Sequence, residues 1–288
     1  MSNNLQGILW ALVATALFAT ALAMVKIAVV DFHVLQILFI RQVVVLASAL
    51  PALCSTFPQS LKTERPVIHA VRLTGAFVAL STGIWAVALL PLTTAITLAF
   101  SQVFFVALLA SRFLDERVDL PRIIAVIVGF IGVIVVIQPG PDGFLNVAAF
   151  IPVAGALGAA TAVICVRTLS QTESTATLLG YQAVVIGLLS GIPLLWVWTT
   201  PTVPEFAFLF GIGILSAIAQ WFGVKALRLG EASVVGNMEY SKLIYAVLIG
   251  YLVFAEIPDL PTIAGALIII SAALTLLHRE TLNRHSAA

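Results

Sequence analysis

The stretch Phe100-Ser101-Gln102, followed by Phe105, recurs in the second half of the chain as Tyr240-Ser241-Lys242, followed by Tyr245. Both copies lie inside long apolar runs, and the register continues into the sequence Asp-Leu-Pro at 119–121 and again at 259–261. The same polar pattern at the same place in two apolar runs indicates that the chain contains an internal repeat. Internal repeats of apolar segments are typical of membrane transport proteins.

Further matches extend this repeat through the chain in the same order. The matched positions are Ala19-Thr20-Ala21 with Ala160-Thr161-Ala162, Lys26 with Arg167, Arg41-Gln42 with Tyr181-Gln182, Leu80-Ser81 with Leu215-Ser216, Trp85 with Trp221, and Glu116 with Glu256. The spacing is nearly constant. We therefore expect one repeat in residues 1–140 and a second in residues 141–288.

The composition indicates that the repeats span a membrane. Hydrophobic residues make up 61% of the chain and charged residues 9%, whereas soluble domains have about 25% charged residues. A bilayer span needs roughly 20 mostly apolar residues. The runs that meet this requirement are Leu5–Val30, His33–Leu53, Ala70–Leu90, Thr94–Arg112, Pro121–Gln138, Val147–Thr168, Ala176–Trp198, Phe206–Leu227, Ser233–Phe254 and Pro261–Leu277.

These runs predict an all-α membrane protein with ten transmembrane helices. Because each repeat has five helices, an odd number, the second repeat must cross the bilayer upside down relative to the first. Most of the 14 Lys and Arg residues lie in every second gap between the runs. Basic residues collect on the cytoplasmic side, so we expect both termini to be cytoplasmic.

The charged and metal-ligating residues exclude several other classes. A net charge of +1 argues against a nucleic-acid partner, which needs a dense basic patch. The four histidines lie at span ends or in the tail, and the chain has no HExxH sequence. An intramembrane enzyme is therefore a remote alternative, as is a membrane assembly factor, and we expect no cofactor or metal.

The chain resembles the ten-helix EamA-type permeases of the drug/metabolite transporter superfamily. The resemblance rests on the arrangement of five plus five helices, on Arg41, on Glu116 and Glu256, and on the stretch Phe113–Arg117 before a glycine-containing fifth helix. It implies a central cavity between the repeats and a place in the bacterial inner membrane. Members of this family carry amino acids, nucleotide sugars, sugar phosphates, vitamins or cationic drugs, and include YddG-like exporters of aromatic amino acids and riboflavin carriers.

Polar residues inside the fourth and ninth runs are the first candidates for substrate binding. A polar group in hydrocarbon is costly and is expected to face protein or a water-filled cavity. The candidates are Thr97, Ser101 and Gln102 in the fourth run, and Asn237, Glu239, Ser241 and Lys242 in the ninth. Two structural alternatives remain, namely hydroxyls bonded to their own helix and a mutually neutralised Glu239–Lys242 pair.

Aromatic residues in the middle of spans form the second group. Trp85 and Trp221 occupy matched positions beside Ser81 and Gln220, away from the span ends where interfacial tryptophans are found. An indole face suits an aromatic or cationic solute. We therefore include these four residues and Tyr240 among the candidate cavity-lining residues.

Three other polar residues receive secondary, structural roles. Arg41 lies inside the second run. It could bind a carboxylate, but we expect it mainly to hold helices together. Glu116 and Glu256 follow the fourth and ninth runs, and are expected to brace the turns before Pro121 and Pro261.

These expectations combine into a secondary transporter of small organic metabolites that works by alternating access. The favoured activity is export of amino acids, especially aromatic ones, or of related amphipathic solutes. The alternative is a carrier for a vitamin such as riboflavin or for cationic drugs. The partners expected are a small-molecule substrate and the lipid bilayer, with monomer and homodimer both open.

Overall fold

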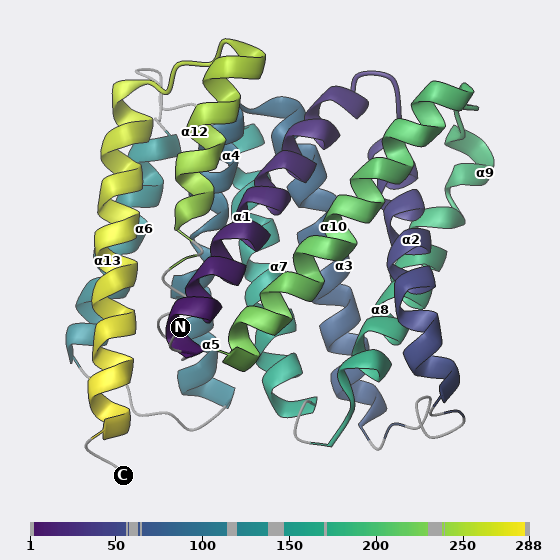
Figure 1. Ribbon diagram of the computed structural model, residues 1–288. Helices are drawn as coiled ribbons and strands as arrows, with labels where there is room; N and C mark the ends of the chain where they lie inside the picture. The colour runs from purple at the N-terminus through teal and green to yellow at the C-terminus, as the bar shows by residue number, and fades with distance from the viewer. Residues whose placement is uncertain are drawn as a thin grey trace.

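The computed structural model describes residues 3–55, 57, 63, 65–113, 120–137, 147–169, 172–229, 238 and 240–285. Within these ranges the protein is a bundle of helices (Figure 1). The helices are α1 (Asn3–Ala28), α2 (Val34–Ser55), α3 (Pro66–Leu89), α4 (Leu92–Ala99), α5 (Gln102–Phe113), α6 (Leu120–Ile137), α7 (Val147–Leu169), α8 (Thr175–Gly191), α9 (Leu194–Val197), α10 (Val203–Leu229), α12 (Ser241–Phe254) and α13 (Leu260–His285).

Apolar helices lie at the places of the expected membrane spans in the described part of the chain. In the described part of the chain, 6 helices are long and apolar enough to cross a bilayer, and shorter apolar helices lie at Ile123–Ile137, Thr177–Gly191, Ser241–Phe254 and Leu260–Thr275. The protein is therefore a multi-pass membrane protein. Helix α1 begins and α13 ends at the same end of the bundle, which we call the terminal end (lower in Figure 1).

The helix pairs that pack most extensively follow the repeat. They are α3 with α7, α1 with α10, α6 with α13, and α2 with α8. Under the repeat, α3 corresponds to α10 and α7 to α1, so the first two pairs are equivalent to each other. The α6–α13 and α2–α8 pairs each join a helix to its own equivalent. This is the pattern that two copies related by a two-fold axis produce.

Close packing of α3 against α7 depends on two facing glycines. A Cβ atom on Gly75 would lie 2.6 Å from the carbonyl oxygen of Gly158, and one on Gly158 would lie 2.7 Å from that of Gly75. Helices without side chains at the contact can bring their backbones together, which is a common way to pack helices in membranes.

Two of the expected spans are interrupted. The run expected as one helix from Thr94 to Arg112 is divided into α4 and α5 by a turn at Phe100 and Ser101. The tight hydrogen bonds from Ser101 N to Leu98 O, 3.1 Å, and from Phe104 N to Ser101 O, 3.0 Å, keep this turn bonded. The run expected to end at Trp198 breaks after Gly191, because Pro193 has no backbone N–H to continue the helix.

Candidate substrate cavity

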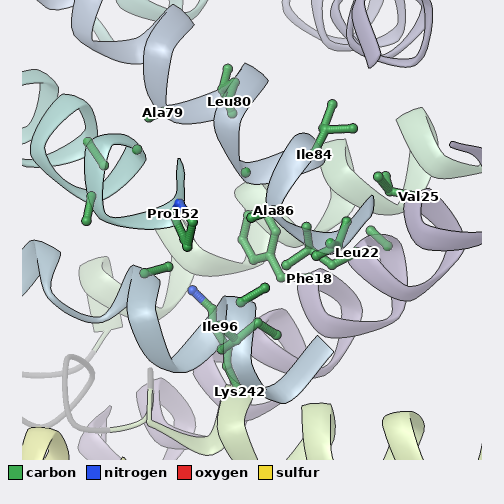
Figure 2. Close-up of a pocket in the computed structure, with 18 of the residues that line it drawn as sticks. Phe18, Leu22, Val25, Ala79, Leu80, Ile84, Ala86, Ile96, Pro152 and Lys242 are labelled. Atoms are coloured by element: carbon green, nitrogen blue, oxygen red, sulfur yellow. The ribbon is translucent and has the colours of Figure 1, made fainter. Parts of the chain in front are cut away.

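A cavity of about 310 Å³ lies in the middle of the bundle and is lined by both repeats (Figure 2). Helices α1, α2, α3, α4 and α5 contribute from the first repeat, and α7, α10 and α12 from the second. Most of the lining is apolar. The polar side chains among the described lining residues are Arg41, Gln102, Ser216 and Lys242.

The break between α4 and α5 and the start of α12 lie beside this cavity. The turn at Phe100 and Ser101 precedes Gln102, the first residue of α5, and Tyr240 is the turn residue before α12, which carries Lys242. Both Gln102 and Lys242 line the cavity, and they are matched positions of the repeat. Discontinuous helices near the middle of the bundle are a common way for transporters to build a binding site.

The rings that precede these residues meet each other. Phe100 and Tyr240 stack with their centroids 5.2 Å apart and their planes at 25°. Next to them, the Ser241 hydroxyl is 2.7 Å from that of Thr15 on α1. Matched residues of an inverted repeat can touch each other only near the axis that relates the copies. The cavity therefore lies at the axis between the repeats.

Lys242 extends into the cavity from α12 (Figure 2). Its Nζ lies 5.2 Å from the centre of the Phe18 ring on α1, which also lines the cavity. A cation over an aromatic face is stabilised by the ring quadrupole. The Lys242 side chain thus lies among apolar and aromatic side chains of the lining.

Arg41 also lines the cavity, from α2. Its Nε is buried and has no hydrogen-bond partner among the described residues. The other arginine in the interior, Arg72 on α3, is bonded to the Leu178 carbonyl and to the Gln182 side chain, each at 3.1 Å. Arg72 is buried and Arg41 is half-buried, and among the described residues only Arg72 is held by protein acceptors. The structural role that the sequence assigned to Arg41 has no contact to support it in the described part of the chain.

Several hydroxyl candidates are committed to their own helices. Ser101 donates to the Leu98 carbonyl at 2.7 Å, and Ser81 donates to the Phe77 carbonyl at 2.7 Å. Thr97 is fully buried and its hydroxyl has no hydrogen-bond partner among the described residues. None of these three lines the cavity. The bonds of Ser101 and Ser81 agree with the alternative in which such groups bond within the helix.

The two tryptophans lie outside the cavity. Trp85 is 49% exposed and Trp221 is 60% exposed, and neither belongs to the cavity lining. The half-buried Gln220 also lies outside it. The rotations of α3 and α10 about their axes turn these indoles outward, and one-dimensional position along a span does not reveal that rotation. Asn237, Glu239 and Glu116 lie outside the described residues.

A polar cluster closes the end of the bundle opposite the terminal end. Glu256, after α12, forms an ion pair with Lys26 of α1 and accepts the backbone N–H of Leu92 at 2.8 Å. Lys26 also donates to the Leu90 carbonyl at 3.0 Å. Glu256 was expected to brace the turn before Pro261, but its partners lie in the other repeat. Val25, which precedes Lys26 in the chain, lines the cavity, so this cluster lies toward one end of it.

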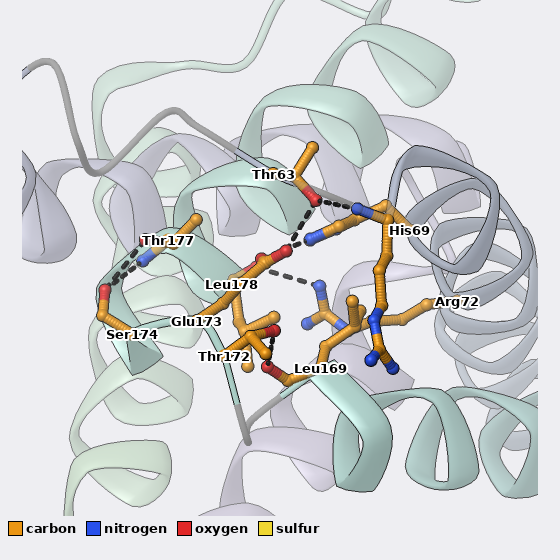
Figure 3. Close-up of polar contacts among 10 residues, drawn as sticks. Thr63, His69, Arg72, Leu169, Thr172, Glu173, Ser174, Thr177 and Leu178 are labelled. Carbon is orange, nitrogen blue, oxygen red and sulfur yellow. Dashed lines mark hydrogen bonds and ion pairs between the residues drawn. The ribbon is translucent and has the colours of Figure 1, made fainter.

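A second polar cluster joins the repeats at the terminal end (Figure 3). His69 of α3 lies 2.5 Å from Glu173, which also accepts the Thr63 hydroxyl at 2.6 Å. The His69 ring lies 4.6 Å from that of Tyr181. The sequence analysis missed this cluster, because His69 and Glu173 are far apart in the chain and lie at span ends, where polar residues are ordinary.

Comparison with known proteins agrees with this architecture. The model of the EamA-like transporter family matches residues 5–138 and 146–277. A solved protein crystal structure shares the fold with a TM-score of 0.67 and 16% sequence identity, over 96% of this chain and 99% of that chain.

Curated relatives are transporters with different cargoes. The chain is 29% identical to an S-adenosylmethionine uptake transporter of Rickettsia conorii, over 97% of this chain and 95% of the relative. It is 29% identical to a riboflavin transporter of Vibrio cholerae, over 97% and 95%. It is 28% identical to a pseudopaline exporter of Pseudomonas aeruginosa, over 94% and 95%. With both repeats matched by one family model, the chain belongs to the EamA-like transporter family and is a small-molecule transporter.

Proposed function

We propose that this transporter exports an amino acid or a related amphipathic metabolite by alternating access of residues 1–140 and 141–288. The observation that carries the proposal is the cavity at the axis between the repeats, with Arg41, Gln102 and Lys242 set into an apolar lining. Its volume of about 310 Å³ is at the lower end of the range of about 300–1,000 Å³ for small-molecule sites. A compact solute with an apolar body and a charged end suits such a site.

Two polar clusters support alternating access. The Lys26–Glu256 ion pair joins the repeats at one end of the bundle and the His69–Glu173 contact joins them at the other. We expect the repeats to separate one of these contacts when the cavity opens to the corresponding side. A transporter that rocks its repeats about a fixed site would break them in turn.

The charge of the lining favours one cargo over another. The charged residues among the described lining residues, Arg41 and Lys242, are both basic, which favours a carboxylate and disfavours cationic drugs. A vitamin such as riboflavin remains the second candidate, because a relative with 29% identity is named a riboflavin transporter. The sequence analysis expected Trp85 and Trp221 to contact an aromatic solute. Phe18 lines the cavity, and we propose that its ring makes this contact instead.

The test is flux into liposomes that contain the purified full-length protein. Radiolabelled amino acids, S-adenosylmethionine and riboflavin are offered separately, and we expect saturable flux of an amino acid or of the amino-acid derivative. Lys242→Gln should lower that flux at least about tenfold by removing a cavity cation. The matched control is Lys225→Gln, since Lys225 lies over the Trp10 ring outside the cavity. Saturable flux of riboflavin alone would favour the second candidate.

Direction is tested in cells. Expression in a bacterial host should raise its resistance to toxic amino-acid analogues if the protein exports them. Increased sensitivity to the same analogues would contradict export and leave uptake. The Lys242→Gln variant, expressed at the same level, should remove the effect.

A further inference from the structure

Arg41 differs from the other polar groups in the core of the bundle. Gln36, five residues before it on α2, is fully buried and bonds the backbone of Thr199 through both its nitrogen, at 2.6 Å, and its oxygen, at 3.0 Å. Arg72 is held by two acceptors of the second repeat. Arg41 has a buried Nε without a hydrogen-bond partner among the described residues, and the side chain lines the cavity.

A guanidinium without an anion is unfavourable at this depth. Arg41 lies seven residues after the start of α2 at Val34, which is about 10 Å along the helix. Charged side chains inside a membrane are rare and pair with other groups or face water-filled cavities. The ion pairs in the described part of the chain are Lys26–Glu256 and His69–Glu173, and neither involves Arg41. Among the described residues no acidic side chain pairs with Arg41, which leaves a solute in the cavity as a source of its counter-ion.

The chemistry of the group and of its surroundings defines the ligand. A guanidinium presents a planar fork of donors that matches the two oxygens of a carboxylate. Near it, the cavity is lined by apolar side chains, among them Leu22, Val25, Ile84 and Ile96. Such a surface receives the apolar body of a solute.

We propose that Arg41 binds the carboxylate of the transported solute and thereby selects carboxylate-bearing metabolites over their amine counterparts. This inference rests on the proposed function and assigns one part of the same cavity. The sequence analysis expected Arg41 mainly to hold helices together, whereas this proposal assigns it to substrate binding. It also implies that Lys242, on the other repeat, contacts a different part of the solute, so that the solute spans the two repeats.

The experiment compares matched pairs of solutes that differ in the carboxylate. The pairs are tryptophan with tryptamine, phenylalanine with phenethylamine, and S-adenosylmethionine with its decarboxylated form. Each is tested as an inhibitor of the flux measured in liposomes and as a stabiliser of the purified protein in thermal unfolding, because a bound ligand raises the unfolding temperature. Wild-type protein should prefer the acid of at least one pair by about tenfold or more.

Arg41→Gln should lower that preference to about one, and Arg41→Lys should retain part of it, since lysine keeps the charge without the planar fork. The control is Arg65→Gln, which removes the same charge from an exposed residue at the end of the bundle and should keep the wild-type preference. If Arg41→Gln does not yield folded protein, Arg41→Lys provides the same comparison.

Three outcomes would overturn the inference. The first is an unchanged acid preference in a folded Arg41 variant. The second is a wild-type protein that transports a solute but treats acid and amine alike. The third is Arg41-dependent binding of phosphorylated solutes, with O-phosphoserine as the probe, but of no carboxylate. If no solute in the panel is transported or bound, the proposed function fails as well, so the two failures are distinguished by wild-type flux.

Discussion

Phe100 and Tyr240 occupy equivalent positions in the two repeats, and their rings stack face to face with centroids 5.2 Å apart. Each ring belongs to the turn that precedes a cavity-lining residue, Gln102 in one repeat and Lys242 in the other. The contact is therefore both a part of the interface between repeats and a support for the binding site.

Truncating Phe100 and Tyr240 should lower the free energy of unfolding, and the effects of the two substitutions should not be additive. Phe100→Ala and Tyr240→Ala should each destabilise the fold, and the double variant should show a coupling energy of about 0.5–1.5 kcal/mol, the usual value for an aromatic pair. The measurement is the free energy of unfolding in detergent for the complete double-mutant cycle. The matched control pairs Phe100→Ala with Phe206→Ala, since Phe206 contacts Phe210 instead. Strictly additive effects of Phe100 and Tyr240 would contradict the contact.

Loss of the Lys26–Glu256 ion pair should open one end of the cavity. Glu256→Gln keeps an oxygen for the Leu92 N–H but removes the charge that holds Lys26. In a background without Cys54 and Cys165, Val25→Cys provides a reporter on the cavity wall. We expect Glu256→Gln to speed labelling of this cysteine by a membrane-impermeant thiol reagent several-fold. Asp31→Asn, which removes an exposed charge near the same end, is the control and should leave the rate unchanged.

Removing Glu173 should be more damaging to stability than removing an exposed carboxylate. Glu173→Ala leaves the buried His69 side chain and the Thr63 hydroxyl without their acceptor. Breaking a buried pair by deleting one partner costs about 3–5 kcal/mol. We expect a clear fall in the unfolding temperature of the purified protein. Asp31→Asn again serves as the comparison, and equal effects of the two substitutions would show that the cluster at the terminal end contributes little.

The outward positions of Trp85 and Trp221 predict contact with lipid. A variant that retains one of these tryptophans, with every other tryptophan changed to Phe, should lose most of its fluorescence in bilayers of brominated lipid. Transport should be preserved in Trp85→Phe and Trp221→Phe, because neither indole lines the cavity. Protection from brominated lipid combined with loss of flux would support the sequence expectation instead.

The sequence analysis was accurate where the information is local or periodic. Long apolar runs predicted the spans, because a helix is the structure that satisfies its own backbone in hydrocarbon. The matched polar positions predicted the repeat, and the resemblance to EamA-type permeases was confirmed by the family model over both halves. The break at Phe100 and Ser101 was missed, since neither residue is a proline or a glycine and the run reads as continuously apolar.

The candidate site was predicted only in part. Gln102 and Lys242 were predicted to bind substrate because they occupy matched positions of the repeat. Both line the cavity in the structure. Trp85 and Trp221 were chosen for their depth in the span, but depth does not give the rotation of a helix about its axis. Arg41 was assigned mainly a structural role, and only the packed helices show that its buried Nε has no hydrogen-bond partner among the described residues.

The sequence by itself determined the spans and the internal repeat, since both depend on the order of apolar and polar residues along the chain. The tertiary structure alone decided which side chains face the cavity and which contacts close its ends. Glu256 meets Lys26 and the backbone of Leu92, and His69 meets Glu173. These partners come from opposite repeats, and only the packing of helices that are distant in the chain brings them within bonding distance.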